Sequence, residues 1–144
     1  MATYQKFQQF TEDMAHKVHN LGSDTLQVAL CAAANAPVVT NSVLLDLTQI
    51  AYTNLSTQVI TTSTSGQVTG TYDLVLNDLT LTASGGAAAA FRYVVVFNQT
   101  SVTPTDALIC FFDYGSDLTL ADGESLTIDF ESDGPTTGSL FTLA

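Results

Sequence analysis

The stretch that decides the fold reads FRYVVVFN over 91–98, ALICFFDYG over 107–115 and LTLADGESLTIDF over 118–130. The first two segments are apolar on both faces, which is typical of strands at the centre of a sheet. A polar loop with one proline joins them, so we expect an antiparallel hairpin that places its aromatic residues in the core. The third segment alternates around Asp122-Gly123, a pattern that indicates strands on either side of a tight turn.

Further strand patterns lie outside this stretch, over 25–32, 59–64, 71–77, 79–81 and 140–143. The segment 42–52 (SVLLDLTQIAY) is compatible with a strand or a short helix, and we favour one or two helical turns. About eight short strands with polar turns fit an all-β fold, either a β-sandwich or a jelly-roll-like barrel. We therefore expect an N-terminal helical segment over 1–24 and a single β-sandwich domain over 25–144.

Apolar residues recur at spacings of three and four over 4–21, which predicts one amphipathic helix ending before Gly22. The stripe either covers a sheet face of its own chain or is donated to a neighbouring protein. We favour the covering helix, because it would shield apolar sheet surface from water. If the stripe is instead an interface, its residues are Tyr4, Phe7, Phe10 and Met14.

The composition limits the partners. The chain has 144 residues, enough for one domain with a core of its own, and 14 acidic against 3 basic residues, which gives a net charge of -11. This charge would repel the phosphates of nucleic acids and anionic membrane surfaces, so we expect neither as a partner. No secretory signal and no apolar run of roughly 20 residues is recognisable. Cys31 and Cys110 lie in apolar strand patterns, so buried reduced thiols are favoured over a disulfide.

Metal-binding patterns are weak in this chain. His16 and His19 have the spacing of two ligands on a helix, but no third ligand is near, and we interpret both as part of a solvated last turn. Asp129, Glu131, Asp133 and Gly134 have the spacing that opens a calcium loop, yet Leu140 stands where the bidentate carboxylate belongs. We predict no metal and no cofactor; a loose cation site in the acidic stretch 113–133 stays open as the alternative.

Catalytic patterns are equally weak. Both histidines lie in the N-terminal segment, and no G-x-S-x-G turn, phosphate-binding loop or dinucleotide fingerprint is present. Acidic pairs for glycoside hydrolysis can be chosen in many ways, so they carry no information. We therefore expect that the protein is not an enzyme.

Several segments taken together resemble a known class of proteins. HNLGSDTLQVAL, AAANAPVVTNSVLLDLTQIA, FRYVVVFN and ALICFFDYGSDLTLADGESLTIDF, followed by a short end-strand, resemble small virion proteins of tailed bacteriophages over roughly 4–143. In such proteins a β-sandwich sits on the capsid as a decoration or cement protein, or belongs to the tail or neck. The resemblance lies in the order and spacing of the segments, and it brings no active-site residues with it.

The resemblance implies a capsid decoration protein that binds the outer shell and bridges major capsid subunits. Its partners would be the major capsid protein and copies of itself, and it would be assembled into virions in the bacterial host cytoplasm. The alternative is a tail or neck structural protein, including a fibre module that recognises the host.

Overall fold

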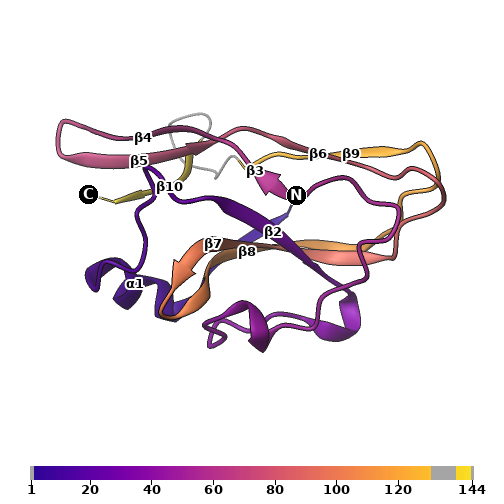
Figure 1. Cartoon of the computed structure of the whole chain (residues 1–144), viewed down its shortest axis with the longest axis horizontal. Helices are drawn as coiled ribbons and strands as arrows, with labels where there is room; N and C mark the ends of the chain where they lie inside the picture. The colour runs from indigo at the N-terminus through magenta and orange to yellow at the C-terminus, as the bar shows by residue number, and fades with distance from the viewer. Residues whose placement is uncertain (1, 131–138, 144) are drawn as a thin grey trace.

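The computed structural model describes residues 2–130 and 139–143 and consists of two layers of antiparallel β-sheet (Figure 1). The prediction of an all-β fold with one α-helix is confirmed, whereas its jelly-roll variant is not confirmed. The strands are β1 (Thr3–Lys6), β2 (Leu26–Cys31), β3 (Val59–Ile60), β4 (Thr62–Val68), β5 (Thr71–Leu76), β6 (Leu79–Thr82), β7 (Phe91–Val102), β8 (Thr105–Leu118), β9 (Ser125–Ile128) and β10 (Ser139–Leu143). The helix is α1 (Gln8–Ala15), and two single 3-10 turns are η1 (Ala33–Asn35) and η2 (Leu44–Asp46).

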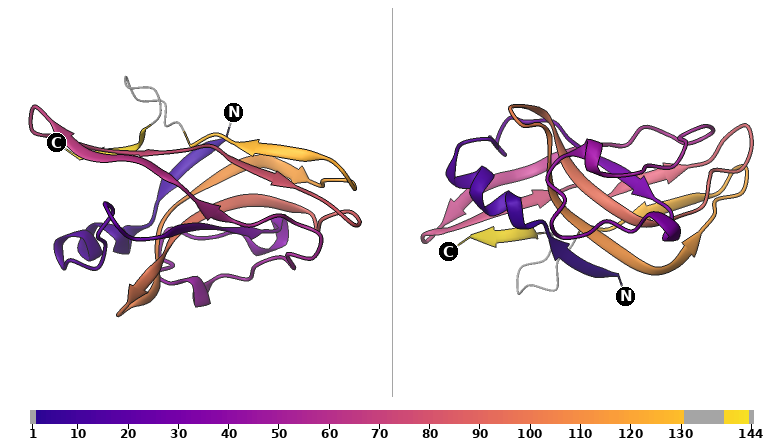
Figure 2. Two further views of the ribbon diagram at one scale, coloured as in Figure 1. Left: turned by 45° about the horizontal axis from the view of Figure 1, so that its top comes forward. Right: turned by 90° about the horizontal axis from the view of Figure 1, so that it is seen from below.

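One layer is a five-stranded sheet with the order β1-β8-β7-β2-β3. The strands β7 and β8 pair antiparallel from Phe91–Leu118 to Val102–Thr105, which confirms the predicted hairpin. Pairing continues almost to the tip, where a cis peptide bond precedes Pro104. Both strands are long and strongly curved (Figure 2).

The second layer consists of a three-stranded sheet, β10-β5-β4, and the pair β6-β9. The chain runs almost directly from β5 into β6, so the two pieces follow each other along one side of the molecule (Figure 1). The β4–β5 hairpin, with its two-residue turn Thr69-Gly70, extends to one end of this layer. Both turn residues have positive φ, 52° and 87°, as a two-residue hairpin requires.

The five-stranded sheet is buried on both faces, which explains why β7 and β8 are apolar on both faces. One face packs on the second layer through a large core that includes Leu30, Val96 and Phe130. The other face carries a smaller cluster around Phe7, Val95 and Phe111. The loop that contains η2 covers this cluster with Val39, Leu44 and Leu47.

The N-terminal helix is shorter than the periodicity predicts. Residues 3–6 form β1, which pairs with β8 from Thr3–Asp113 to Lys6–Cys110, and the helix covers only 8–15. The prediction of a helix over 4–21 is therefore wrong at both ends. A strand alternates its side chains between two faces, so Tyr4 packs on Phe112 toward the large core while Phe7 reaches the opposite side of the sheet.

The Asp122-Gly123 turn does not join a hairpin. Gly123 has a φ of 85°, and a turn is present, but β9 pairs with β6 rather than with the end of β8. The turn thus carries the chain from one layer to the other. The alternating pattern around it arises because Leu120, just after the end of β8, and Ile128, on β9, both contribute to the large core.

Cys31 and Cys110 are buried and unpaired, as predicted, and burial raises the pKa of the Cys31 thiol to about 11. Segment 42–52 contains one 3-10 turn, η2, and its other residues form no helix and no named strand. In the part of the chain that the structure describes, no helix is long and apolar enough to cross a membrane.

Candidate interaction surface

The four residues named from the sequence as an interface do not form one stripe. Phe7 is fully buried beside Phe111, with ring centroids 5.1 Å apart, and Phe10 is buried in the large core. Tyr4 and Met14 are half-buried and pack on that core. The N-terminal segment therefore serves mainly as the internal covering that the sequence favours, and only its edge is accessible to a partner.

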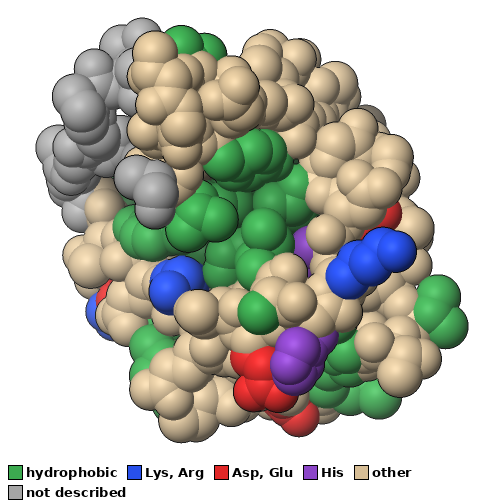
Figure 3. All heavy atoms as spheres, turned by 90° about the vertical axis from the view of Figure 1, so that its left-hand side faces the viewer, with side chains coloured by type: hydrophobic (Ala, Val, Ile, Leu, Met, Phe, Trp, Pro, Cys, Tyr) green, Lys and Arg blue, Asp and Glu red, His purple; other side chains and the backbone are tan. Residues whose placement is uncertain are grey.

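An apolar patch lies where α1 faces the inner side of β5 and β10, at the end of the second layer. Its residues are Phe10 and Met14 from α1, Tyr72 from β5, and Phe141 and Leu143 from β10. Viewed from this end, hydrophobic side chains gather in one area (Figure 3). We call this area the α1–β10 patch.

Aromatic contacts hold the α1–β10 patch together. The rings of Phe10 and Phe141 meet edge to face, with ring centroids 5.3 Å apart. The ring centroids of Phe141 and Tyr72 are 6.1 Å apart. The Tyr72 hydroxyl shares a 2.7 Å hydrogen bond with the Ser65 hydroxyl on β4. Leu143, directly opposite Tyr72 across the strand pair, is 56% exposed. The patch thus consists of half-buried aromatic rings that rest on the buried Phe10, with an exposed leucine at its margin.

Charged side chains of both signs lie on the face that carries the α1–β10 patch (Figure 3). Basic side chains lie on both sides of the apolar area (Figure 3). Lys6 and Lys17 stand just before and just after α1, and the Lys6 ammonium donates to the Thr11 hydroxyl at 2.8 Å. The third basic residue, Arg92, is held by Asp113 through bonds of 2.7 and 3.0 Å. In a chain of net charge -11, two of the three basic residues therefore lie next to the ends of α1, which contributes to this patch.

A buried polar cluster lies behind the patch and ties the loop after α1 to the β7–β8 hairpin. The Asn98 amide nitrogen donates to an Asp24 carboxylate oxygen at 2.6 Å and to His19 Nδ1 at 3.0 Å. The Asn98 amide oxygen accepts the backbone N–H groups of Thr100 and Ser101. Asn98 is fully buried, so these bonds replace its hydration.

The interpretation of both histidines as a solvated last turn is wrong for His19. His16 is exposed and lies 3.5 Å from Glu12, whereas His19 is 7% exposed and its ring lies 5.2 Å from that of Phe10. Burial lowers the pKa of His19 and outweighs the opposing attraction of Asp13 and Asp24. The pair therefore does not converge on a common ligand.

Because His19 is buried as a neutral ring, we expect the protein to lose stability under mild acid. In the unfolded chain His19 takes up a proton near its ordinary pKa of 6.5, but the folded protein resists this proton. The free energy of unfolding should therefore be greatest above pH 6.5 and should decrease as pH falls from there toward the lowered folded-state pKa.

Urea denaturation at about pH 7.5 and 5.5, on both sides of the ordinary histidine pKa, measures this decrease. His19→Gln should flatten the difference between the two pH values, because the titrating ring is gone. His16→Gln removes an exposed histidine three residues away and should leave the difference unchanged. An equal loss of stability in all three proteins would contradict the assignment to His19.

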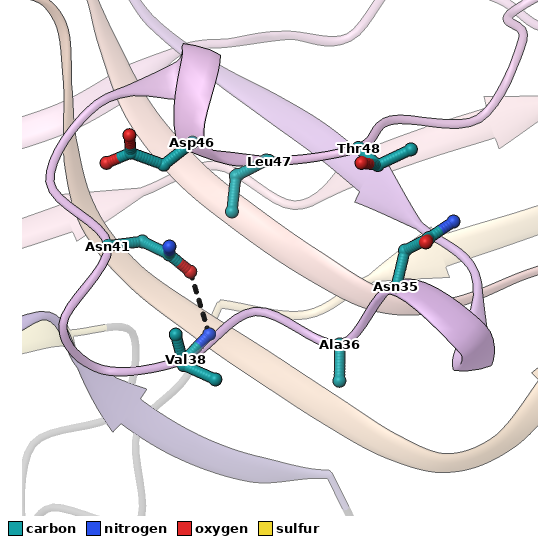
Figure 4. A pocket seen from close by; sticks show the side chains of 7 residues that line it. All are labelled: Asn35, Ala36, Val38, Asn41, Asp46, Leu47 and Thr48. Atoms are coloured by element: carbon teal, nitrogen blue, oxygen red, sulfur yellow. Dashed lines mark hydrogen bonds between the residues drawn. The ribbon is translucent and has the colours of Figure 1, made fainter.

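A small hollow lies in the loop that covers the outer face of the five-stranded sheet (Figure 4). Its volume is about 130 Å³ and its lining includes Asn35, Asn41 and Leu47. The Asp46 carboxylate does not serve a ligand there, because it accepts the backbone N–H groups of Ser42 and Val43 at 2.7 and 3.1 Å. These two bonds lower the Asp46 pKa. Asp46 therefore holds the loop in shape.

The acidic stretch 113–133 offers no converging carboxylates in its described part. Asp113 pairs with Arg92, Asp122 accepts the Gly85 N–H, and Glu124 accepts the Ala121 N–H. Glu131, Asp133 and Gly134 lie outside the described residues. Within residues 2–130 and 139–143, no group of three His, Cys, Asp or Glu side chains is placed to hold a metal ion.

No family model, no curated protein and no solved structure matches this chain. The resemblance to tailed-bacteriophage virion proteins therefore stays a prediction.

Proposed function

We propose that the protein is a decoration protein of a bacteriophage capsid, which docks on the outer shell through the α1–β10 patch and bridges major capsid subunits. The observation that carries this proposal is the patch itself. Aromatic side chains in firm contact lose little conformational freedom when a partner covers them, and such residues are enriched at the centres of protein interfaces. The order of segments that resembles phage virion proteins supports the choice of a capsid partner.

The chemistry of the patch indicates what the partner presents. Phe141 and Leu143 offer apolar surface, so the partner contributes an apolar segment of its own. Lys6 and Lys17 favour acidic residues around that segment, whereas the acidic remainder of the molecule repels them. This combination supports docking with the α1–β10 patch toward the shell.

Docking of this kind stabilises a shell by linkage. A protein that binds neighbouring subunits only when they are together adds its binding free energy to the cost of separating them. Modest contacts suffice, because many copies act on one particle. Heads that lack the protein should therefore form normally but lose packaged DNA at a lower temperature than decorated heads.

Binding of purified protein to expanded shells that lack it tests the proposal. Leu143→Glu places a carboxylate in the patch and should weaken binding at least about tenfold, because a buried unpaired charge opposes docking. Leu45→Glu is the matched control: Leu45 is 93% exposed on η2, so the same substitution should leave binding unchanged.

Two results would contradict the proposal. Equal binding of both variants and the unaltered protein would remove the patch from the interface. Binding to tails or necks, with none to shells, would favour the alternative of a tail or neck structural protein.

A further inference from the structure

The strand β4 forms an unprotected edge in the second layer. It is the outer strand in the order β10-β5-β4, and among the described residues no strand pairs with its other side. With seven residues it is longer than the other described edge strands, β1, β3, β6, β9 and β10. Its sequence, TSTSGQV, contains no charged residue and no proline, which are the usual means of keeping an edge from pairing.

The absence of charge extends around the edge. No Asp, Glu, Lys, Arg or His occurs over 47–72, although the chain carries a net charge of -11. Two copies that approach through most other surfaces bring carboxylates together, but two copies that approach through β4 do not. Asp73, opposite Gly66 on β5, is the nearest charge across the hairpin. In a pair joined through β4 the two Asp73 residues are three strand spacings apart, about 14 Å, which exceeds the screening length of about 8 Å.

The register of the hairpin determines which groups point outward. Val68 and Thr71 flank the two-residue turn and form a hydrogen-bonded pair, as do Gly66 and Asp73 two residues further on. Ser65 and Gln67, which alternate with these paired residues along β4, therefore direct their backbone N–H and C=O groups away from β5. These groups form the free edge.

From these features we infer that β4 pairs antiparallel with β4 of a second copy of this chain, around a two-fold axis beside Gly66. Ser65 of each copy then exchanges both backbone hydrogen bonds with Gln67 of the other. Gly66 faces its counterpart at a non-hydrogen-bonded site, where backbones approach most closely. Within its own chain Gly66 has no need to be glycine, since its φ is not positive and an added Cβ would meet no atom within 4 Å. A glycine in a strand often marks such an approach of another backbone.

The pairing is independent of the docking proposed above, because β4 and the α1–β10 patch use different groups of the same layer. A contact of one strand pair is small, so the isolated dimer is weak. On a particle, copies are held close together, so their effective concentration is high. The same weak contact is then enough to link neighbouring copies.

Sedimentation velocity of the full chain over about 10 µM to 1 mM measures the association directly. The unaltered protein should dimerise, and rising salt should strengthen the dimer because it screens the mutual repulsion. Gln67→Pro removes one outward N–H from each copy and should weaken the dimer at least about tenfold. Gln67→Ala loses the same side chain but keeps the N–H, so it is the matched control and should dimerise normally.

A second variant keeps the test independent of any effect of proline on folding. Thr64 and Val68 are exposed, and in the inferred register each lies opposite the other across the two-fold axis. The double substitution Thr64→Asp, Val68→Asp should abolish the dimer at low salt and restore it at high salt, as directly opposed carboxylates require. The inference is overturned if the unaltered protein stays monomeric, if Gln67→Pro dimerises like Gln67→Ala, or if Leu143→Glu rather than Gln67→Pro abolishes dimerisation.

Discussion

Replacing Phe7 with alanine should lower the free energy of unfolding by about 3–5 kcal/mol, and Phe10→Ala should cost a similar amount. Phe7 is 0% exposed and fills the cluster on the outer face of the five-stranded sheet, whereas Phe10 fills the core between the layers. Each truncation removes apolar contacts and leaves a cavity that the close-packed surroundings cannot fully close. Urea denaturation monitored by circular dichroism measures both values.

Val102→Ala is the control for these truncations. Val102 is 79% exposed at the end of β7, so its loss should change stability by no more than about 0.5 kcal/mol. If Phe10→Ala left stability unchanged but abolished binding to shells, Phe10 would be an interface residue rather than a core residue.

Asn98→Ala should be the most damaging polar substitution, with an expected cost of about 2–4 kcal/mol. The amide satisfies His19, Asp24 and two backbone N–H groups, and all of them would lose a partner inside the protein. A buried polar group without a partner costs more than the bond itself is worth. Thermal or chemical unfolding of the variant at pH 7.5 measures the loss.

Asn41→Ala provides the comparison for Asn98→Ala. The Asn41 side chain accepts one bond, from the Val38 N–H at 2.8 Å, in an exposed loop where water can replace it. Its removal should cost no more than about 1 kcal/mol. A similar loss in both variants would mean that the buried network around Asn98 does not act as a unit.

The sequence predicts most strands because local patterns determine them. Apolar residues on both faces of 91–98 and 107–114 indicate central strands, and the structure places β7 and β8 inside a sheet covered on both sides. The wrong prediction of a helix over 4–21 has a local cause as well. Tyr4, Phe7 and Phe10 have helical spacing, but pairing of β1 with the exposed edge of β8 satisfies backbone groups that a first helical turn would leave free.

Long-range pairing limits what the sequence reveals about the candidate surface. Phe10 and Met14 are recognisable from their spacing. Tyr72, Phe141 and Leu143 join them only because β5 pairs with β10. The paired residues, Leu74 with Phe141 and Tyr72 with Leu143, are 67 or more positions apart in the sequence. His19 is a similar case. Its partner Asn98 lies 79 residues away in the sequence, and no local signal distinguishes the buried His19 from the exposed His16.

Copy number and location on the virion test the capsid proposal most directly. Cryo-electron microscopy of intact particles should show this β-sandwich on the outer surface of the head, at positions repeated by capsid symmetry, with α1 and the end of β10 facing the major capsid protein. Density confined to the tail or to a single ring at the neck, or a copy number that matches such a ring, would contradict the proposal.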